Sequence, residues 1–200
     1  MHTTSPLLVA ASEAMHSALK SHPLRIQHSI AVAAAAIRLA DHLDRQDGEE
    51  LVAAAYLHDI GHSPSLAMTG HHGLNGARHL QGQFPERIVA LVAHHSESRW
   101  EAHLRGLTGE LAEYPREASV VADALTYCDM TTGPTGEAMT LTDRLAEIQR
   151  RYGRETLTNR SVELSRPCLE AAITRFRQAF PEAPDLSVVQ RNAADSPPAR

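Results

Sequence analysis

The sequence is poor in the features that mark several specialised classes of protein. Its 200 residues include only two cysteines, Cys128 and Cys168, which excludes a disulfide framework and a cysteine-based zinc finger. Aromatic residues make up 4% of the chain, so the hydrophobic fraction of 42% consists largely of aliphatic side chains. Such a core favours close packing of helices over a β-sandwich. No apolar run approaches the length of a membrane span, and we expect no membrane partner.

Positive charge is also scarce. The formal net charge of −5 provides no basic surface that could follow a phosphate backbone, which argues against duplex nucleic acid as a partner. A small phosphorylated molecule remains compatible with this charge. Residues 1–6 lack the basic start of a signal peptide, so the expected location is the cytoplasm. The length suits one domain with a sizeable core.

Histidine, in contrast, is abundant. The chain has 13 histidines, many of them between His58 and His103, and this clustering makes a metal site worth seeking. Residues 51–57 are apolar on every side, which predicts a buried helix that delivers His58 and Asp59 into the core. An ionised Asp59 in that place needs a hydrogen bond, an ion pair or a metal. We expect Gly61 to end the helix in a left-handed conformation.

The hydrophobic periodicity predicts an all-α fold of one domain. Helices are expected at about 7–20, 24–43, 49–59, 73–80, 85–95, 99–113 with a break near 106–109, 117–129, 141–152 and 167–180. Residues 1–23 then form an N-terminal helix that packs on the bundle, and residues 24–180 form the helical domain. Residues 181–200 lack periodicity and are expected to be a disordered tail.

Several polar residues share helix stripes with apolar residues and are expected to face the interior. They are His28, His58, Asp59, His72, His95 and Asp129. Four imidazoles and two carboxylates form a suitable ligand set for two divalent transition ions. Two alternatives stay open at this stage, because Asp123 could replace Asp129 and His94 could replace His95.

Five short motifs occur in a recognisable order. They are Arg25-Ile26-Gln27-His28, Leu57-His58-Asp59-Ile60-Gly61, His72-Gly73-Leu74-Asn75-Gly76-Ala77, His95-Ser96 and Tyr127-Cys128-Asp129-Met130. With them the sequence resembles the HD superfamily of metal-dependent phosphohydrolases, over residues 24–136. The resemblance implies an HD-type helical bundle.

The resemblance also implies roles for the candidate ligands. One ion would be held by His28, His58, Asp59 and Asp129, and a second by Asp59, His72 and His95. Asp59 would bridge the two ions, and a metal-bound water would be the nucleophile. Iron or manganese is the first expectation, with zinc, cobalt or nickel as alternatives. The presence of both His72 and His95 is similar to the two-metal branch, which includes bacterial enzymes that hydrolyse diadenosine tetraphosphate.

This chain departs from the family pattern at two places. His62 stands where many members have lysine, so its role is open. The glycine-tyrosine-proline motif of the cyclic dinucleotide phosphodiesterases is absent after His95, which argues against their substrate. The roles of Arg25 and Arg144 are open as well, because either could clamp a substrate phosphate or form a structural ion pair.

The expected function is therefore hydrolysis of a phosphoester or phosphoanhydride in a nucleotide or another small phosphorylated metabolite. One alternative is an HD-type di-iron oxygenase, and another is a non-catalytic HD signalling module. The complete set of six ligands argues against the non-catalytic alternative. Whether the chain forms a homodimer is left open.

Overall fold

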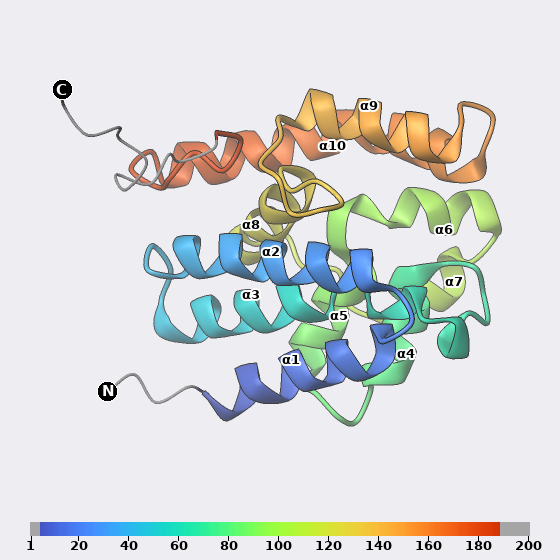
Figure 1. The fold of residues 1–200 in the computed structure, drawn as a ribbon, viewed down its shortest axis with the longest axis horizontal. Coiled ribbons are helices and arrows are strands. Elements are labelled where there is room, and N and C mark those ends of the chain that lie inside the picture. Colours follow the sequence, from blue (N-terminus) through green and yellow to red (C-terminus); the bar gives the residue numbers. More distant parts are fainter. Residues whose placement is uncertain (1–4, 189–200) are drawn as a thin grey trace, which may run out of the picture.

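The structure, a computed structural model, describes residues 5–188. Its helices are α1 (Pro6–Leu19), α2 (Pro23–Ala40), α3 (Arg45–Leu57), α4 (His72–Leu80), α5 (Glu86–His94), α6 (Arg99–Arg105), α7 (Thr108–Leu111), α8 (Val120–Met130), α9 (Leu141–Tyr152) and α10 (Leu157–Ala179). Three short 3-10 turns join them: η1 (Ile60–His62), η2 (Pro64–Leu66) and η3 (His95–Glu97). The described residues contain no β-strand, so the predicted all-α class is confirmed (Figure 1).

Helix α3 lies at the centre of the bundle. It packs against α1, α2, α5 and α8, and its residues 51–55 and 57 are buried. The helix begins four residues earlier than expected, because the side chain of Asp44 accepts the backbone N–H of Asp47 and caps it. At its other end the chain continues into His58 and Asp59, which are 0% and 4% exposed. The predicted burial of this stretch is therefore confirmed.

Helices α9 and α10 lie together along one side of the molecule, and α1 lies on the opposite side (Figure 1). They share a small second core made by Met130, Leu145, Ile148 and Leu169. The expected start of the last helix at Pro167 is wrong, because α10 begins at Leu157 and contains the proline in its interior. Proline removes one helical hydrogen bond, and so the sequence suggested a boundary there. Buried residues on both sides of Pro167 hold the helix together across it.

Residues 181–188 form turns that follow α10. Leu186 is 3% exposed, and its backbone N–H donates to the Tyr127 hydroxyl at 3.0 Å. The expectation of a disordered tail from residue 181 is therefore wrong for residues 181–188. The sequence did not predict this packing, because one anchoring leucine gives no periodic signal. The rest of the expected tail, residues 189–200, lies outside the described residues. None of the helices in residues 5–188 is long and apolar enough to cross a lipid bilayer.

Candidate metal centre

The structure brings the six predicted ligand residues together from α2, the end of α3, α4, η3 and α8. They form two groups, and within each group one ligand atom per residue lies within 4.8 Å of the others. The first group is His28, His58 and Asp129, and the second is Asp59, His72 and His95. Metal binding by these residues stays a prediction. The orientation and the hydrogen bonds of their donor atoms show whether they suit a metal ion.

Each histidine of the two groups is held through its Nδ1 atom. His28 donates to the carbonyl of Gly133 at 3.0 Å, His58 to that of Ala55 at 2.8 Å, and His95 to that of Val92 at 2.7 Å. A carbonyl only accepts hydrogen bonds, so each Nδ1 carries the proton and leaves a lone pair on Nε2. This is the arrangement in which proteins present histidine to a metal ion.

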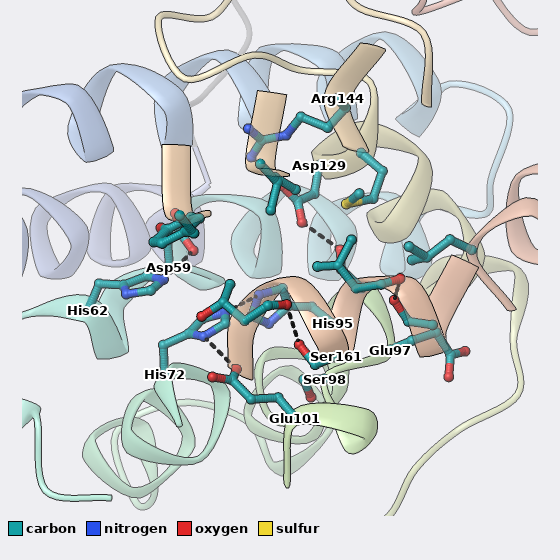
Figure 2. A pocket seen from close by; sticks show the side chains of 18 of the residues that line it. Asp59, His62, His72, His95, Glu97, Ser98, Glu101, Asp129, Arg144 and Ser161 are labelled. Atoms are coloured by element: carbon teal, nitrogen blue, oxygen red, sulfur yellow. Dashed lines mark hydrogen bonds and ion pairs between the residues drawn. The ribbon is translucent and has the colours of Figure 1, made fainter. Parts of the chain in front are cut away.

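The fourth histidine, His72, has a carboxylate as its partner. Its Nδ1 lies 3.5 Å from Oε2 of Glu101, and its ring faces His95 (Figure 2). Burial opposes a charge on His72, but the hydrogen bond with Glu101 prevails and raises the pKa of the imidazole. Burial, helped by the neighbouring His72, lowers the pKa of His95 to about 3. His95 is therefore neutral at physiological pH.

The Nε2 atoms point at one another and at carboxylate oxygens, so each of these contacts needs a proton or a metal ion between its two atoms. Nε2 of His28 lies 3.1 Å from Oδ1 of Asp129, and the Nε2 atoms of His72 and His95 are 3.1 Å apart. Nε2 of His58 is fully buried and has no hydrogen-bond partner among the described residues. Facing lone pairs in a buried place are unfavourable unless a cation lies between them. The donor set therefore fits divalent transition ions.

One oxygen of each carboxylate is fixed by a donor outside the two groups. Oδ2 of Asp59 accepts from Nη1 of Arg25 at 2.5 Å, and Oδ2 of Asp129 accepts from the Ser96 hydroxyl at 2.5 Å. Burial alone would raise the pKa of Asp59, but the charge of Arg25 outweighs it and holds the pKa well below its usual value. Burial also opposes charge on Asp129, where the hydrogen bond with His28 prevails and lowers the pKa. Both carboxylates are thus ionised, with Oδ1 directed to the histidines.

The two alternatives from the sequence are directed elsewhere. Nε2 of His94 lies 2.8 Å from the carbonyl of Tyr114, outside both ligand groups. Asp123 forms a bidentate ion pair with Arg175 of α10, at 2.6 and 2.8 Å. The geometry therefore favours His95 and Asp129 as the ligand candidates.

His95 reaches the site by a route that helix periodicity did not predict. Helix α5 ends at His94, and His95 belongs to η3, where Ser96 and Glu97 have φ values of 47° and 58°. Positive φ is uncommon for residues other than glycine. The carboxylate of Glu97 accepts from Arg99 at 2.6 Å and from Arg116 at 2.7 Å, which holds the corner in place. This bend of the backbone places His95 in the second ligand group and directs the Ser96 hydroxyl to Asp129.

Gly61 does not end the helix in a left-handed conformation, as expected, and is required for another reason. Its φ is not in the left-handed region, and a Cβ atom at this position would lie only 1.9 Å from the carbonyl oxygen of His72. Glycine is therefore needed because η1 packs directly on the first turn of α4. This contact sets His72 beside Asp59, and a sequence pattern carries no sign of it.

Two further residues contact the ligand candidates: His62, whose role the sequence left open, and Glu101, which it did not predict. The ring of His62 stacks on that of His72 with centroids 4.2 Å apart, and its Nε2 lies 3.5 Å from Oδ1 of Asp59. Burial, followed by the charge of His72, lowers the pKa of His62 well below its usual value. Glu101 orients His72, as described above. Its position on the charged helix α6 gave no sequence signal for that role.

A pocket of about 890 Å³, including its open mouth, lies over the centre. The site residues form one wall, and α9 and α10 form another (Figure 2). Its charged residues are four arginines and four carboxylates: Arg25, Arg105, Arg144, Arg151, Asp59, Glu97, Glu101 and Asp129. These charges balance, so bound divalent ions would make the pocket positive and suited to an anionic ligand.

Comparison with known proteins gives one match. The family model described as HD domain matches residues 25–148, which is more than half of the chain. The matched range includes all six ligand candidates and ends before α10. Searches of the curated proteins and of the solved structures gave no match.

Proposed function

This chain belongs to the HD domain family, and we propose that it is a metal-dependent phosphohydrolase acting on a nucleotide or another small phosphorylated metabolite. HD domains are usually metal-dependent phosphohydrolases. The observation that carries the proposal is the orientation of the imidazoles, and above all the buried Nε2 of His58, which has no hydrogen-bond partner among the described residues. Oδ1 of Asp59 and Oδ1 of Asp129 lie 3.7 and 3.8 Å from it, too far for a hydrogen bond, and a cation among these atoms would satisfy all three.

We propose two ions. His28, His58 and Asp129 would hold one, and Asp59, His72 and His95 would hold the other, with Asp59 shared between them. Nitrogen and oxygen donors of this kind suit iron, manganese, zinc, cobalt and nickel alike. Iron or manganese stays our first expectation. When bound, such ions polarise a phosphoryl oxygen and increase the acidity of water at the site.

The protein's own residues position and charge the site. Arg25 and Ser96 each hold one carboxylate oxygen, so Asp59 and Asp129 keep their other oxygens directed inward. Glu101 orients His72 through Nδ1, which leaves Nε2 of that ring directed to His95. These partners fix the ligand atoms before any substrate arrives, which reduces the reorganisation required during the reaction.

The substrate's organic part would lie against α10. That wall of the pocket presents the hydroxyl-bearing Thr158, Ser161 and Ser165 together with Val162 and Leu169. All five lie beyond residue 148, where the family match ends, so the family match carries no information about this wall of the pocket. The two pairs of histidines support the two-metal branch, so a dinucleoside polyphosphate is one substrate candidate.

The proposal is tested with protein loaded with Mn²⁺ or Fe²⁺. A panel of nucleoside monophosphates and diphosphates, dinucleoside polyphosphates and sugar phosphates is assayed for released phosphate or nucleotide, with and without dioxygen. Wild-type protein and the control Asp123→Ala should hydrolyse at least one member regardless of dioxygen, and Asp59→Ala should hydrolyse none. The proposal is wrong if no member is hydrolysed while the loaded protein consumes dioxygen with an organic substrate.

A further inference from the structure

Arg144 on α9 is a buried arginine with unused hydrogen-bond donors. It is 5% exposed and lines the pocket over the candidate metal centre. Its Nη1 donates to Glu147 at 2.6 Å, and its Nη2 lies 3.9 Å from Oδ1 of Asp129, too far for a hydrogen bond. Its Nε is buried and has no partner in the part of the chain that the structure describes. A buried donor left in this state is unfavourable, which indicates that a ligand completes it.

Two of the other three arginines of the pocket, Arg25 and Arg105, have partners that account for them. Arg25 donates to Asp59 at 2.5 Å and to the Tyr152 hydroxyl at 2.8 Å, so it serves the carboxylate and links α2 to α9. Arg105 makes two hydrogen bonds to Glu101, at 2.7 and 3.0 Å. Each of these two arginines thus has a structural role that explains its position.

Glu147 keeps the guanidinium of Arg144 in place. Its carboxylate accepts from Arg144 through one oxygen and pairs with Nε of Arg151 through the other, at 3.1 Å. Figure 2 shows the Arg144 side chain next to Asp129. The nitrogen atoms that remain without hydrogen bonds, Nε and Nη2, lie on one edge of a planar fork whose geometry matches two oxygens of a phosphoryl group.

We propose that Arg144 binds a phosphoryl oxygen of the substrate directly and thereby selects phosphorylated ligands. This inference rests on the proposed function, because it places the phosphoryl group between the metal centre and α9. It assigns to Arg144 the clamping role and to Arg25 the structural one, which the sequence left open between them. Asp129 does not account for the position of Arg144, because the separation of 3.9 Å is too long for a hydrogen bond.

The test measures binding of inorganic phosphate to the metal-loaded protein by titration calorimetry, with metal content determined in parallel. Arg144→Gln should raise the dissociation constant for phosphate about tenfold or more, with unchanged metal content, because charge-assisted hydrogen bonds are lost. Arg150→Gln is the matched control. Arg150 lies on the same helix but is exposed and outside the pocket, so its loss should leave phosphate binding unchanged. In the assay with a hydrolysed substrate, KM should rise by a similar factor in Arg144→Gln.

Phosphate affinity equal to wild type in Arg144→Gln would overturn the inference, and so would a loss of metal in that variant. If circular dichroism shows that Arg144→Gln does not fold, Arg144→Lys decides, because the ammonium keeps the charge but lacks the fork. Weaker phosphate binding with full metal content then supports the inference, and wild-type binding overturns it. Failure of the proposed function is separate. Phosphate binding that depends on Arg144 without hydrolysis of any panel member would leave this site standing and remove the activity.

Discussion

Replacing Gly61 with alanine should displace α4 and disrupt the second ligand group. The added Cβ would lie 1.9 Å from the carbonyl oxygen of His72, 2.8 Å from its carbonyl carbon and 2.5 Å from the backbone nitrogen of Gly76. All three are backbone atoms that cannot rotate away, so α4 must move by more than about 1 Å to reach an ordinary contact distance. His72 is the first residue of that helix and would move with it.

The size of the effect follows from two opposing contributions. Overpacking costs about 1–3 kcal/mol and more where the backbone must shift, whereas alanine lowers the entropy of the unfolded chain and restores about 0.4–1 kcal/mol. We expect Gly61→Ala to lose about 2 kcal/mol or more of unfolding free energy. For a chain of this length that loss lowers the melting temperature by about 4–8 °C.

Thermal and denaturant unfolding of the metal-free protein measure this loss, and metal analysis of the loaded protein measures the damage to the site. Gly109→Ala is the matched control. No atom outside its immediate neighbours lies within 4 Å of a Cβ there, its φ is not in the left-handed region, and it sits in helix α7. That variant should be as stable as wild type or up to about 1 kcal/mol more stable. Wild-type melting temperature and metal content in Gly61→Ala would refute the proposed contact between η1 and α4.

Four substitutions test the carboxylates. Asp59→Ala should remove the bound metal and destabilise the protein by about 3–5 kcal/mol, because it leaves the largely buried Arg25 without its partner. Metal content equal to wild type in that variant would contradict the assignment. Asp123→Ala should keep its metal and lose no more than about 1 kcal/mol, because its ion pair is at the surface, whereas Asp129→Ala should lose metal. Loss of metal in Asp123→Ala together with retained metal in Asp129→Ala would make Asp123 the ligand in place of Asp129. Ser96→Ala should weaken metal affinity about 10–100-fold, measured by competition with a chelator, because it removes the donor that holds Asp129. An unchanged affinity would show that the Ser96 hydroxyl does not orient the carboxylate.

The fold and the candidate ligands were readable because their signals are local. Residues 51–57 are apolar on every side, and the structure buries them around the segment that presents His58 and Asp59. His28 and Asp129 lie on apolar helix stripes, and their side chains meet at 3.1 Å. Helical spacing determines which side of a helix a residue occupies, and this made both residues candidates, although Asp123 stayed open as an alternative to Asp129.

The features that the sequence did not predict depend on contacts between distant segments. Gly61 is required by its approach to α4, and Glu101 acts because α6 brings it to His72. The positive φ of Ser96 is maintained by hydrogen bonds around the following Glu97, which no periodicity encodes. Pro167 lies inside α10 because packing on both sides compensates for the missing hydrogen bond. In each case tertiary structure overrides a local preference.

The central claim is that the buried histidines and aspartates hold two metal ions. Anomalous diffraction from crystals of the metal-loaded protein, recorded on both sides of the metal absorption edge, tests it most directly. The account predicts two peaks, one among His28, His58 and Asp129 and one among Asp59, His72 and His95. A single peak at the first group would contradict the two-ion site, and the absence of any peak beside Nε2 of His58 would contradict the metal centre itself.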